Sequence, residues 1–339
     1  MWQWAEMIRF LRSRRCGGVA RAGALAMCAV LMAGNYSPAM ADGYPERPVQ
    51  LVVPAGPGSS TDTIMRSLAQ AASPMLGQSI VILNKPGASG TIGVGYVTKS
   101  EPDGYTIGGV PSGAITMAPH VVAQSFSQAD YRIVAMITQA AGVLCVHPDF
   151  PAKNASEFLA ELKNNPDKYT YGSDGVGAFV QFSTARIFQP LGIRQRIIPY
   201  SGADQTVTAF LSRTIDIYGG AIATIAQFVA EGKAKCLLLT TARRFATLPD
   251  VESLEDVKMA PSQTLLWRAV IAPRDIPQDR FEKLRDVLTK AAQTPEFKAM
   301  AAKRGEEVWV ISAEDAAKYA QSEFVQMEQL ARELRLKPN

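Results

Sequence analysis

The sequence predicts an α/β fold of two lobes, each a mostly parallel sheet flanked by helices. Strand-like apolar runs alternate with helix-like periodicity along the chain, which is typical of parallel sheets. A length of 339 residues fits about two domains. Loops of Gly, Ser, Ala and Pro follow at least four strands, at 54–60, 111–114, 172–178 and 201–204. Because ligands bind beyond the carboxyl ends of strands in such sheets, these loops predict the position of a site.

The first 41 residues have the three parts of a cleavable signal peptide. Five arginines precede an apolar run of about twelve residues, which is too short to span a bilayer. Ala39-Met40-Ala41 fits the cleavage pattern, so we expect residues 1–41 to be removed and the mature chain to begin at Asp42. Ser13-Arg14-Arg15 leaves the general secretory and twin-arginine routes both open. The segment predicts a periplasmic location.

The best-defined unit is a strand, loop and helix between residues 48 and 76. An apolar run ends in the small-residue loop 54–60, and apolar residues recur at helical spacing from Thr61 onward. A helix N-terminus offers unpaired N–H groups and the positive end of the helix dipole, and Ser59 and Ser60 add hydroxyl groups. We therefore expect this loop to bind an anion.

The rest of the chain repeats this alternation of strand and helix. Apolar runs predict strands at 79–83, 105–110, 133–137, 143–146, 169–171, 196–200, 215–218, 236–240, 265–272 and 308–311. Helices are expected at 92–100, before Pro166, around 179–187, up to 211, up to 232, and at 278–292, 295–303 and 313–334. The runs at 133–137 and 143–146 predict a crossing between the lobes. Ser312 and Asp315 predict a capping box at the start of the last helix.

Composition argues against several classes of protein. The five arginines and one glutamate of the signal segment account for the net charge of +4, so the mature chain has a net charge of zero. It therefore lacks the excess of basic residues that is typical of nucleic-acid-binding proteins. The chain has no G-x-S-x-G elbow, no metal-ligand spacing, and no G-x-G-x-x-G after a strand. His120 and His147 each adjoin a proline and are interpreted as loop residues. We expect neither an enzyme nor a bound metal or cofactor.

Two cysteines, Cys145 and Cys236, remain after cleavage, and each lies inside an apolar run. In an oxidising compartment they can form a disulfide, or they can be two separate buried side chains. Their spacing in the sequence does not decide between these alternatives.

The small-residue loops also resemble those of the tripartite tricarboxylate transporter solute-binding proteins, the Bug family. The similar segments, in order, are 44–45 with 51–54, Gly56-Pro57-Gly58 with Thr61-Asp62 and Arg66, 76–78, 84–93, 102–106, 171–173 with Gly175 and Gly177, 199–200 with 202–203, 242–244, 248–251, Trp267, 272–273 and 276–277. They span essentially the whole mature chain, so the resemblance is specific.

The resemblance implies a periplasmic-binding-protein fold, similar to type II, whose two lobes close over a ligand. Lobe one would be 42–142 plus 264–339, and lobe two would be 143–263. It also implies that backbone amides, hydroxyl groups and waters hold a ligand carboxylate. The expected ligand-binding residues are Ala55, Gly56, Gly58, Ser59, Ser60, Ser112, Ser173, Gly177, Ala178, Ser201, Gly202, Ala203 and Asp204.

Individual residues carry further expectations. Asp204 stands where the family often has proline, and it either binds a ligand amine or lies in the first turn of its helix, which the helix dipole favours. Arg268 has two interpretations: the period-two alternation with Leu266 and Val270 favours a residue that faces outward from its strand, whereas the expected position of that strand close to the cleft leaves a role at the site open. Arg66 is expected in an ion pair.

We therefore expect a monomeric periplasmic solute-binding protein that captures a small carboxylate-bearing metabolite by lobe closure. Its partner would be a permease of the tripartite tricarboxylate type. The alternative is a ligand-sensing protein that partners a signalling receptor, and a secreted hydrolase is a less favoured one.

Overall fold

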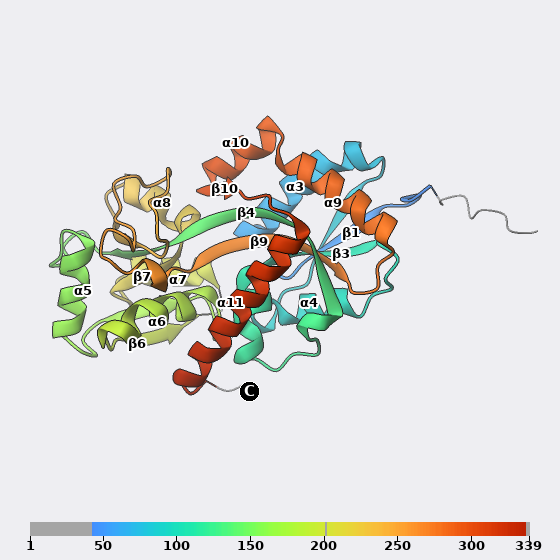
Figure 1. The fold of residues 1–339 in the computed structure, drawn as a ribbon. Helices are drawn as coiled ribbons and strands as arrows, with labels where there is room; N and C mark the ends of the chain where they lie inside the picture. The colour runs from blue at the N-terminus through green and yellow to red at the C-terminus, as the bar shows by residue number, and fades with distance from the viewer. Residues whose placement is uncertain (1–42, 201, 337–339) are drawn as a thin grey trace, which may run out of the picture. The chain divides into compact units, whose positions relative to one another are not determined.

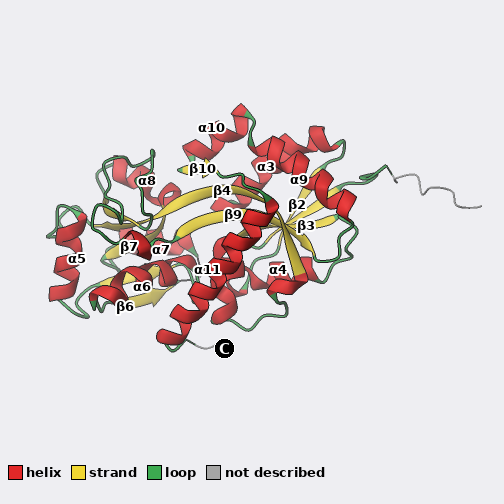
Figure 2. Cartoon of the chain, viewed as in Figure 1, coloured by secondary structure: helices red, strands yellow, loops and turns green. Residues whose placement is uncertain are grey.

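A computed structural model describes residues 43–200 and 202–336, so the predicted signal peptide and Ser201 lie outside the described residues. The described part is mixed α/β, with helices packed around one curled sheet (Figures 1 and 2). The strands are β1 (Val49–Val53), β2 (Ile80–Asn84), β3 (Thr106–Pro111), β4 (Tyr131–Val146), β5 (Thr170–Ser173), β6 (Arg196–Pro199), β7 (Ile217–Ala221), β8 (Lys235–Leu239), β9 (Leu265–Pro273) and β10 (Glu306–Val308).

The helices lie close to their predicted positions. They are α3 (Ser60–Leu76), α4 (Thr91–Thr98), α5 (Ala155–Asn164), α6 (Phe179–Leu191), α7 (Ala203–Leu211), α8 (Ile222–Ala230), α9 (Gln278–Ala292), α10 (Pro295–Lys303) and α11 (Ala313–Glu333). Short helical turns include η1 (Ala88–Gly90) and η2 (Gly113–Met117). In the part of the chain that the structure describes, no helix combines the length and apolar character needed to cross a bilayer.

The sheet is parallel toward its ends and antiparallel in its centre. Its strand order is β2-β1-β3-β9-β4-β7-β5-β6, and β8 and β10 also pair with β4. The pairs of β1 with β2 and β3, and of β5 with β6 and β7, are parallel, as the alternation of strand and helix predicts. The pairs made by β4 and β9 are antiparallel.

Strand β4 connects the two halves of this sheet. The two apolar runs predicted at 133–137 and 143–146 form one strand of 16 residues. Its first part pairs with β9, from Tyr131 to Ala141, and its last part pairs with β7 and β8. In Figure 1, β4 and β9 run side by side between the two halves.

Helix α11 packs across these connecting strands (Figure 2). The Ser312 side chain accepts a hydrogen bond of 3.0 Å from the Asp315 amide, so the predicted cap is present. Ala316 and Ala320 belong to a buried cluster with Trp267. Further along the helix, Met327 joins a second buried cluster with α6. The helix therefore contributes to the apolar core on both sides of the crossing.

Strand β10 begins earlier than its apolar residues predict. The expected strand at 308–311 is Glu306–Val308, paired with β4 through Glu306 and Ala140. Trp309 and Ile311 pack instead against the cluster that contains Trp267. The prediction failed because Glu306 enters the sheet as one member of a buried ion pair, which apolar periodicity does not detect.

The structure joins Cys145 and Cys236 in a disulfide between β4 and β8. The two cysteines face each other directly in the strand register, which brings their side chains together. Of the two alternatives left open by the sequence, the structure therefore has the disulfide.

Candidate ligand-binding site

The N-terminus of α3 is held by its own first turn. The Ser59 hydroxyl caps the helix by accepting a 3.2 Å hydrogen bond from the Asp62 amide. The Asp62 carboxylate in turn accepts hydrogen bonds of 2.8 Å from the Gly58 amide and from Arg66 Nε. Arg66 is thus in an ion pair, as expected. The amide of Gly58, a predicted ligand residue, is already engaged within the protein.

Asn84, at the end of β2, fixes the same loop from the other side. Its side-chain amide donates to the Ala55 carbonyl at 2.9 Å and to Asp62 Oδ1 at 2.8 Å. Burial by itself would raise the pKa of Asp62, but hydrogen bonds from Arg66, Asn84 and Gly58 outweigh burial and hold this pKa below its usual range. Asp62 is therefore a charged anchor that makes the loop at 54–58 rigid.

Two amides of this helix remain available. Among the described residues, no hydrogen-bond acceptor is found for the amide groups of Ser60 and Thr61. They lie in the first turn of α3, where unpaired N–H groups favour an anion. The Ser60 hydroxyl is half-buried and stands beside them. An anion site at this turn stays a prediction.

Arg268 of β9 supports the turn from within the protein. Its Nη2 donates to Ser60 Oγ at 2.9 Å and its Nε donates to Thr61 Oγ1 at 3.3 Å. The expectation that Arg268 faces outward is wrong, because its side chain is only 2% exposed. Trp267 and Val270 lie on opposite faces of β9 and both are fully buried, so both faces of the strand are covered and the alternation of side chains carried no information about solvent.

The charge of Arg268 is matched by Glu306 of β10, at 2.6 Å. Thr138 of β4 donates to the same carboxylate at 2.7 Å, and Ser60 donates to its other oxygen at 3.1 Å. This network connects four segments that are distant in sequence: the start of α3, β4, β9 and β10. The sequence contained no signal for it, because single charged residues on separate strands do not reveal their partners.

On the other half of the sheet, three helices begin without side-chain caps. Helices α6, α7 and α8 follow the carboxyl ends of β5, β6 and β7, and the residues before them are Ala178, Gly202 and Ala221. None of these three residues has a side chain that can accept a hydrogen bond from the first turn. Ala203 begins α7, and Asp204 is exposed in its first turn, the position that the helix dipole favours.

The loop between β5 and α6 is tightly built. The buried Ser173 hydroxyl donates to the Gly175 carbonyl at 2.8 Å, and the Gly177 amide donates to Gln181 Oε1 at 2.7 Å. Gly177 has a φ of +74°, and a Cβ placed on it would lie 2.0 Å from the Val121 side chain. Position 177 therefore requires glycine for its backbone conformation and for the close approach of Val121.

This loop meets the first half of the molecule at two places. Ser89 of η1 donates to the Val176 carbonyl at 2.8 Å. A Cβ on Gly113 of η2 would lie 3.7 Å from the Phe179 amide at the start of α6. Ser112, the residue before Gly113, is fully buried. The structure thus places the predicted loops at 111–114 and 172–178 together.

Asp174, also in this loop, was not among the predicted ligand residues. Its Oδ1 atom is buried and has no hydrogen-bond partner among the described residues. Burial raises the pKa of Asp174, although backbone N–H groups of Asp174 and Val180 lower it in part. The signal that could have found it is a single acidic residue inside a loop of small residues after a strand.

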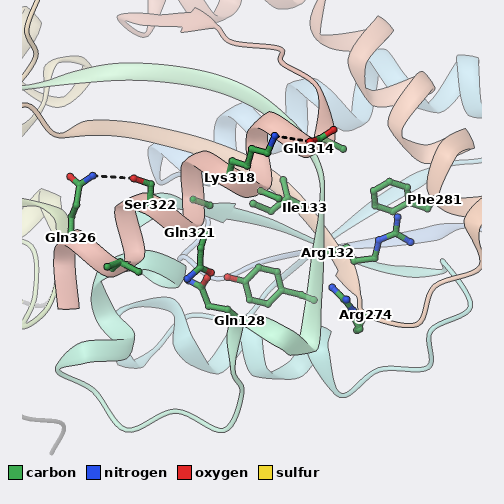
Figure 3. Close-up of a pocket in the computed structure, with 15 residues that line it drawn as sticks. Gln128, Arg132, Ile133, Arg274, Phe281, Glu314, Lys318, Gln321, Ser322 and Gln326 are labelled. Carbon is green, nitrogen blue, oxygen red and sulfur yellow. Dashed lines mark hydrogen bonds and ion pairs between the residues drawn. The ribbon is translucent and has the colours of Figure 1, made fainter. Parts of the chain in front are cut away.

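The structure also has a groove of about 890 Å³ between α11, α9 and the start of β4 (Figure 3). Arg132 and Arg274 lie at one end, and the ion pair of Lys318 with Glu314 lies at its rim. None of the predicted ligand residues lines this groove, and all of its walls fall in the segments predicted as lobe one. A cleft that closes between two lobes takes walls from both, so this groove is not the candidate site.

In the described ranges, no group of three or more His, Cys, Asp or Glu side chains is placed to hold a metal ion. The groups described above for the candidate site are helix N-termini, hydroxyl groups and one arginine paired with a glutamate. It lies at the carboxyl ends of parallel strands in a sheet joined by two long strands. This arrangement is that of a two-lobed solute-binding protein.

Comparison with known proteins gives the family. The chain belongs to the family described as "Tripartite tricarboxylate transporter family receptor", which matches residues 64–336. A UPF0065 protein of Bordetella pertussis is 32% identical over 319 residues, which cover 93% of this chain and 97% of that protein. This is a family of binding proteins of the Bug type, as the resemblance predicted.

Solved structures agree with this assignment. The structure of the periplasmic binding protein BugD is similar with a TM-score of 0.77 and 28% identity, over 87% of this chain and 100% of that chain. MatC of Rhodopseudomonas palustris, solved with bound malate, is similar with a TM-score of 0.76 and 25% identity, over 85% of this chain and 99% of that chain. The predicted fold class is confirmed, and the chain is a solute-binding protein of this family.

Proposed function

We propose that this protein captures a small organic carboxylate at the N-terminus of α3. The observation that carries the proposal is the pair of unmatched amides at Ser60 and Thr61, next to the Ser60 hydroxyl. Two N–H groups in one turn of a helix suit the two oxygens of a carboxylate, while the Ser60 O–H already donates to Glu306 at 3.1 Å. Malate bound to the relative MatC is a ligand of this chemistry.

The site holds its anion by hydrogen bonds rather than by net charge. Arg268 is paired with Glu306, so together they add no net charge beneath the helix. Arg268 instead holds the Ser60 hydroxyl in place at 2.9 Å. A first turn whose conformation is already fixed loses less conformational entropy on binding than a mobile one, so the network favours affinity by preorganisation.

We propose that the second side of the clamp comes from lobe two. The lobes would be 42–142 plus 264–339 and 143–263, with the first boundary inside β4 and the second just before β9. The remaining ligand contacts would come from Gly202 and Ala203 at the start of α7, from Ala178 at the start of α6, and from Ser201. Closure would be driven by contacts that exist only in the closed state, such as the hydrogen bond from Ser89 to Val176.

The remaining assignments follow from the family and the signal segment. We propose export to the periplasm with removal of residues 1–41, action as a monomer without a cofactor or catalysis, and delivery of the ligand to membrane permease subunits. The family description supports a transporter partner.

Thermal-shift screening of the mature protein tests the binding function. The panel contains succinate, malate, citrate, aspartate, glutamate and benzoate, and each hit is then titrated by calorimetry. We expect at least one carboxylate to raise the melting temperature, because a ligand that binds only the folded state stabilises it. A cooperative melting transition that no carboxylate shifts would refute the proposal.

A further inference from the structure

The groove between α11, α9 and the start of β4 has no part in the proposed function, and its shape is elongated. Its wall on α11 runs from Ala313 to Gln326, which is about 20 Å of helix at a rise of about 1.5 Å per residue. An extended peptide of about six residues has the same length. The groove, with a volume of about 890 Å³, is therefore long enough for a short stretch of extended chain.

Two arginines lie close together at one end of this groove (Figure 3). Arg132 is in β4 opposite Ala272 of β9, and Arg274 follows the end of β9, where its amide donates to the Asp130 carbonyl at 3.0 Å. Burial lowers the pKa of Arg132, and the positive charge of Arg274 lowers it further, against a smaller opposite effect of Glu282. The two guanidinium groups therefore repel each other across a short distance.

No carboxylate of the described chain forms an ion pair with either of these arginines. Arg132 donates to Gln278 Oε1 at 3.0 Å and lies 3.8 Å from the centre of the Phe281 ring, and both of these partners are uncharged. The other charges that line the groove, Lys318 and Glu314, pair with each other at 2.6 Å. The groove thus has two unmatched positive charges at one end.

The neighbouring acidic residues do not supply the missing charge inside the groove. Asp130 and Asp275 line a second hollow that adjoins Arg274, and neither lines this groove. Glu282 is exposed on α9 and is not a lining residue either. An acidic occupant would therefore meet complementary charge here, in a chain whose mature part has a net charge of zero.

The rest of the groove combines apolar surface with free amide groups. Ile133 and Phe281 are buried in its walls, and Val325 on α11 is 52% exposed. Gln321 and Gln128 point into the groove from opposite sides (Figure 3), and no hydrogen-bond partner is found for the Gln321 side chain among the described residues. A side-chain amide can both donate to and accept from a peptide backbone, so this part of the groove suits a peptide.

We propose that this groove docks an extended acidic segment of a partner protein. Carboxylates of the segment would bind Arg132 and Arg274, and its backbone would follow α11 toward Gln326. A small inorganic anion would cover the arginine end and leave the apolar part of the groove open. The inference goes beyond the proposed function, because none of the predicted ligand residues lines the groove and docking leaves the carboxylate site free.

Peptide selection on the mature protein tests the inference. A random display library of peptides of about eight residues is selected on the unmodified protein, and enriched peptides are synthesised with acetylated and amidated ends, so that only side chains carry charge. We expect the enriched sequences to contain neighbouring Asp or Glu residues. Replacing these residues by Asn or Gln should weaken binding about tenfold or more, measured by fluorescence anisotropy, because hydrogen bonds to charged groups contribute on this scale.

Two variants locate the binding, and each has a matched control. Arg132→Gln/Arg274→Gln should weaken peptide binding about tenfold or more, whereas Arg194→Gln/Arg213→Gln makes the same change in net charge at arginines that are 73% and 60% exposed and should leave binding within a few-fold. Ala317→Trp fills the groove without a change in charge and should also weaken binding. Gln329→Trp, at an exposed position of α11 outside the groove, should not.

Each outcome supports or overturns the proposal. Selection that enriches no peptide, enriched peptides without carboxylates, or unchanged binding by folded Arg132→Gln/Arg274→Gln would each overturn it. A dimer of the mature protein that Ala317→Trp dissociates, seen by sedimentation, would assign the groove to a second copy of this chain and overturn it as well. The carboxylates found in the thermal-shift screen should bind the arginine variant with unchanged affinity, so failure here leaves the proposed function intact.

Discussion

Arg268 and Glu306 form an ion pair of 2.6 Å in which each side chain is 2% exposed. The pair lies beneath the first turn of α3 and connects β9 with β10. Both charges also hydrogen-bond to Ser60, so the pair and the candidate carboxylate site are parts of one network. Substitutions that break this network should therefore lower both the stability of the fold and the affinity for the ligand.

Replacing one member of this pair by an uncharged residue should destabilise the folded protein. Glu306→Gln or Arg268→Met leaves a buried charge without its partner, and we expect the free energy of unfolding to fall by about 3–5 kcal/mol. The double variant Arg268→Met/Glu306→Gln should lose less than the sum of the two single losses. Denaturant unfolding of the four proteins measures this coupling.

The exposed pair of Arg213 and Asp149 is the matched control for that experiment. These side chains are 60% and 66% exposed, so Asp149→Asn should change the free energy of unfolding by less than about 1 kcal/mol. Equal losses for Glu306→Gln and Asp149→Asn would show that the buried pair has no special role.

Substitutions of Ser59 and Ser60 should have different effects: the first should lower stability and the second should lower affinity for the ligand. Ser59→Ala removes the α3 cap and should lower the free energy of unfolding by about 1 kcal/mol with little change in affinity. Ser60→Ala removes the hydroxyl that connects this turn to Arg268 and Glu306, and it should weaken carboxylate binding by roughly tenfold because the two amides are then held less firmly. Melting curves and calorimetry on both variants test this, and a Ser60→Ala protein with unchanged affinity would place this hydroxyl outside the site.

Glu323 should make stability depend on pH. This residue of α11 accepts hydrogen bonds of 2.9 Å from Thr116 and from Trp267, and burial raises its pKa from 4.5 to about 7. Between these two values the folded protein keeps a proton that the unfolded chain has released. Stability from this group should therefore be lost as the pH rises from about 4.5 to 7, by up to about 3 kcal/mol.

Glu323→Gln removes this titrating group while it keeps an oxygen for the two donors. Its free energy of unfolding should change less across the same pH range than that of the unmodified protein. Denaturant unfolding at half-unit pH steps compares the two proteins. Parallel pH profiles would mean that Glu323 titrates at the same pH in the folded and unfolded states.

The disulfide should stabilise the half of the molecule that contains lobe two. It closes a loop with a sequence separation of 91 residues, and its loss should lower the free energy of unfolding by about 2–4 kcal/mol. Dithiothreitol should lower the melting temperature of the unmodified protein and leave Cys145→Ala/Cys236→Ala unaffected. Recovery of free thiols at both positions from the secreted protein would contradict the pairing.

Several features followed from sequence patterns because their causes are local. The strand, loop and helix around residues 54–60, the cap at Ser312 and the boundaries of α9 and α10 depend on neighbours within one or two turns. The resemblance to a family likewise depended on short loops of small residues. For the same reason, a carboxylate site at the start of α3 could be proposed before the fold was known.

The order of elements, the α/β class and the family could thus be inferred from the amino-acid sequence. The packed fold was needed to show how Arg268, Glu306 and Ser60 meet, why 133–146 is one strand, and that Cys145 faces Cys236. These features depend on pairing between residues far apart in the chain, and a charge on one strand does not reveal the charge that neutralises it. Asp174 is a further example, because only the packed structure shows that its buried Oδ1 has no hydrogen-bond partner among the described residues.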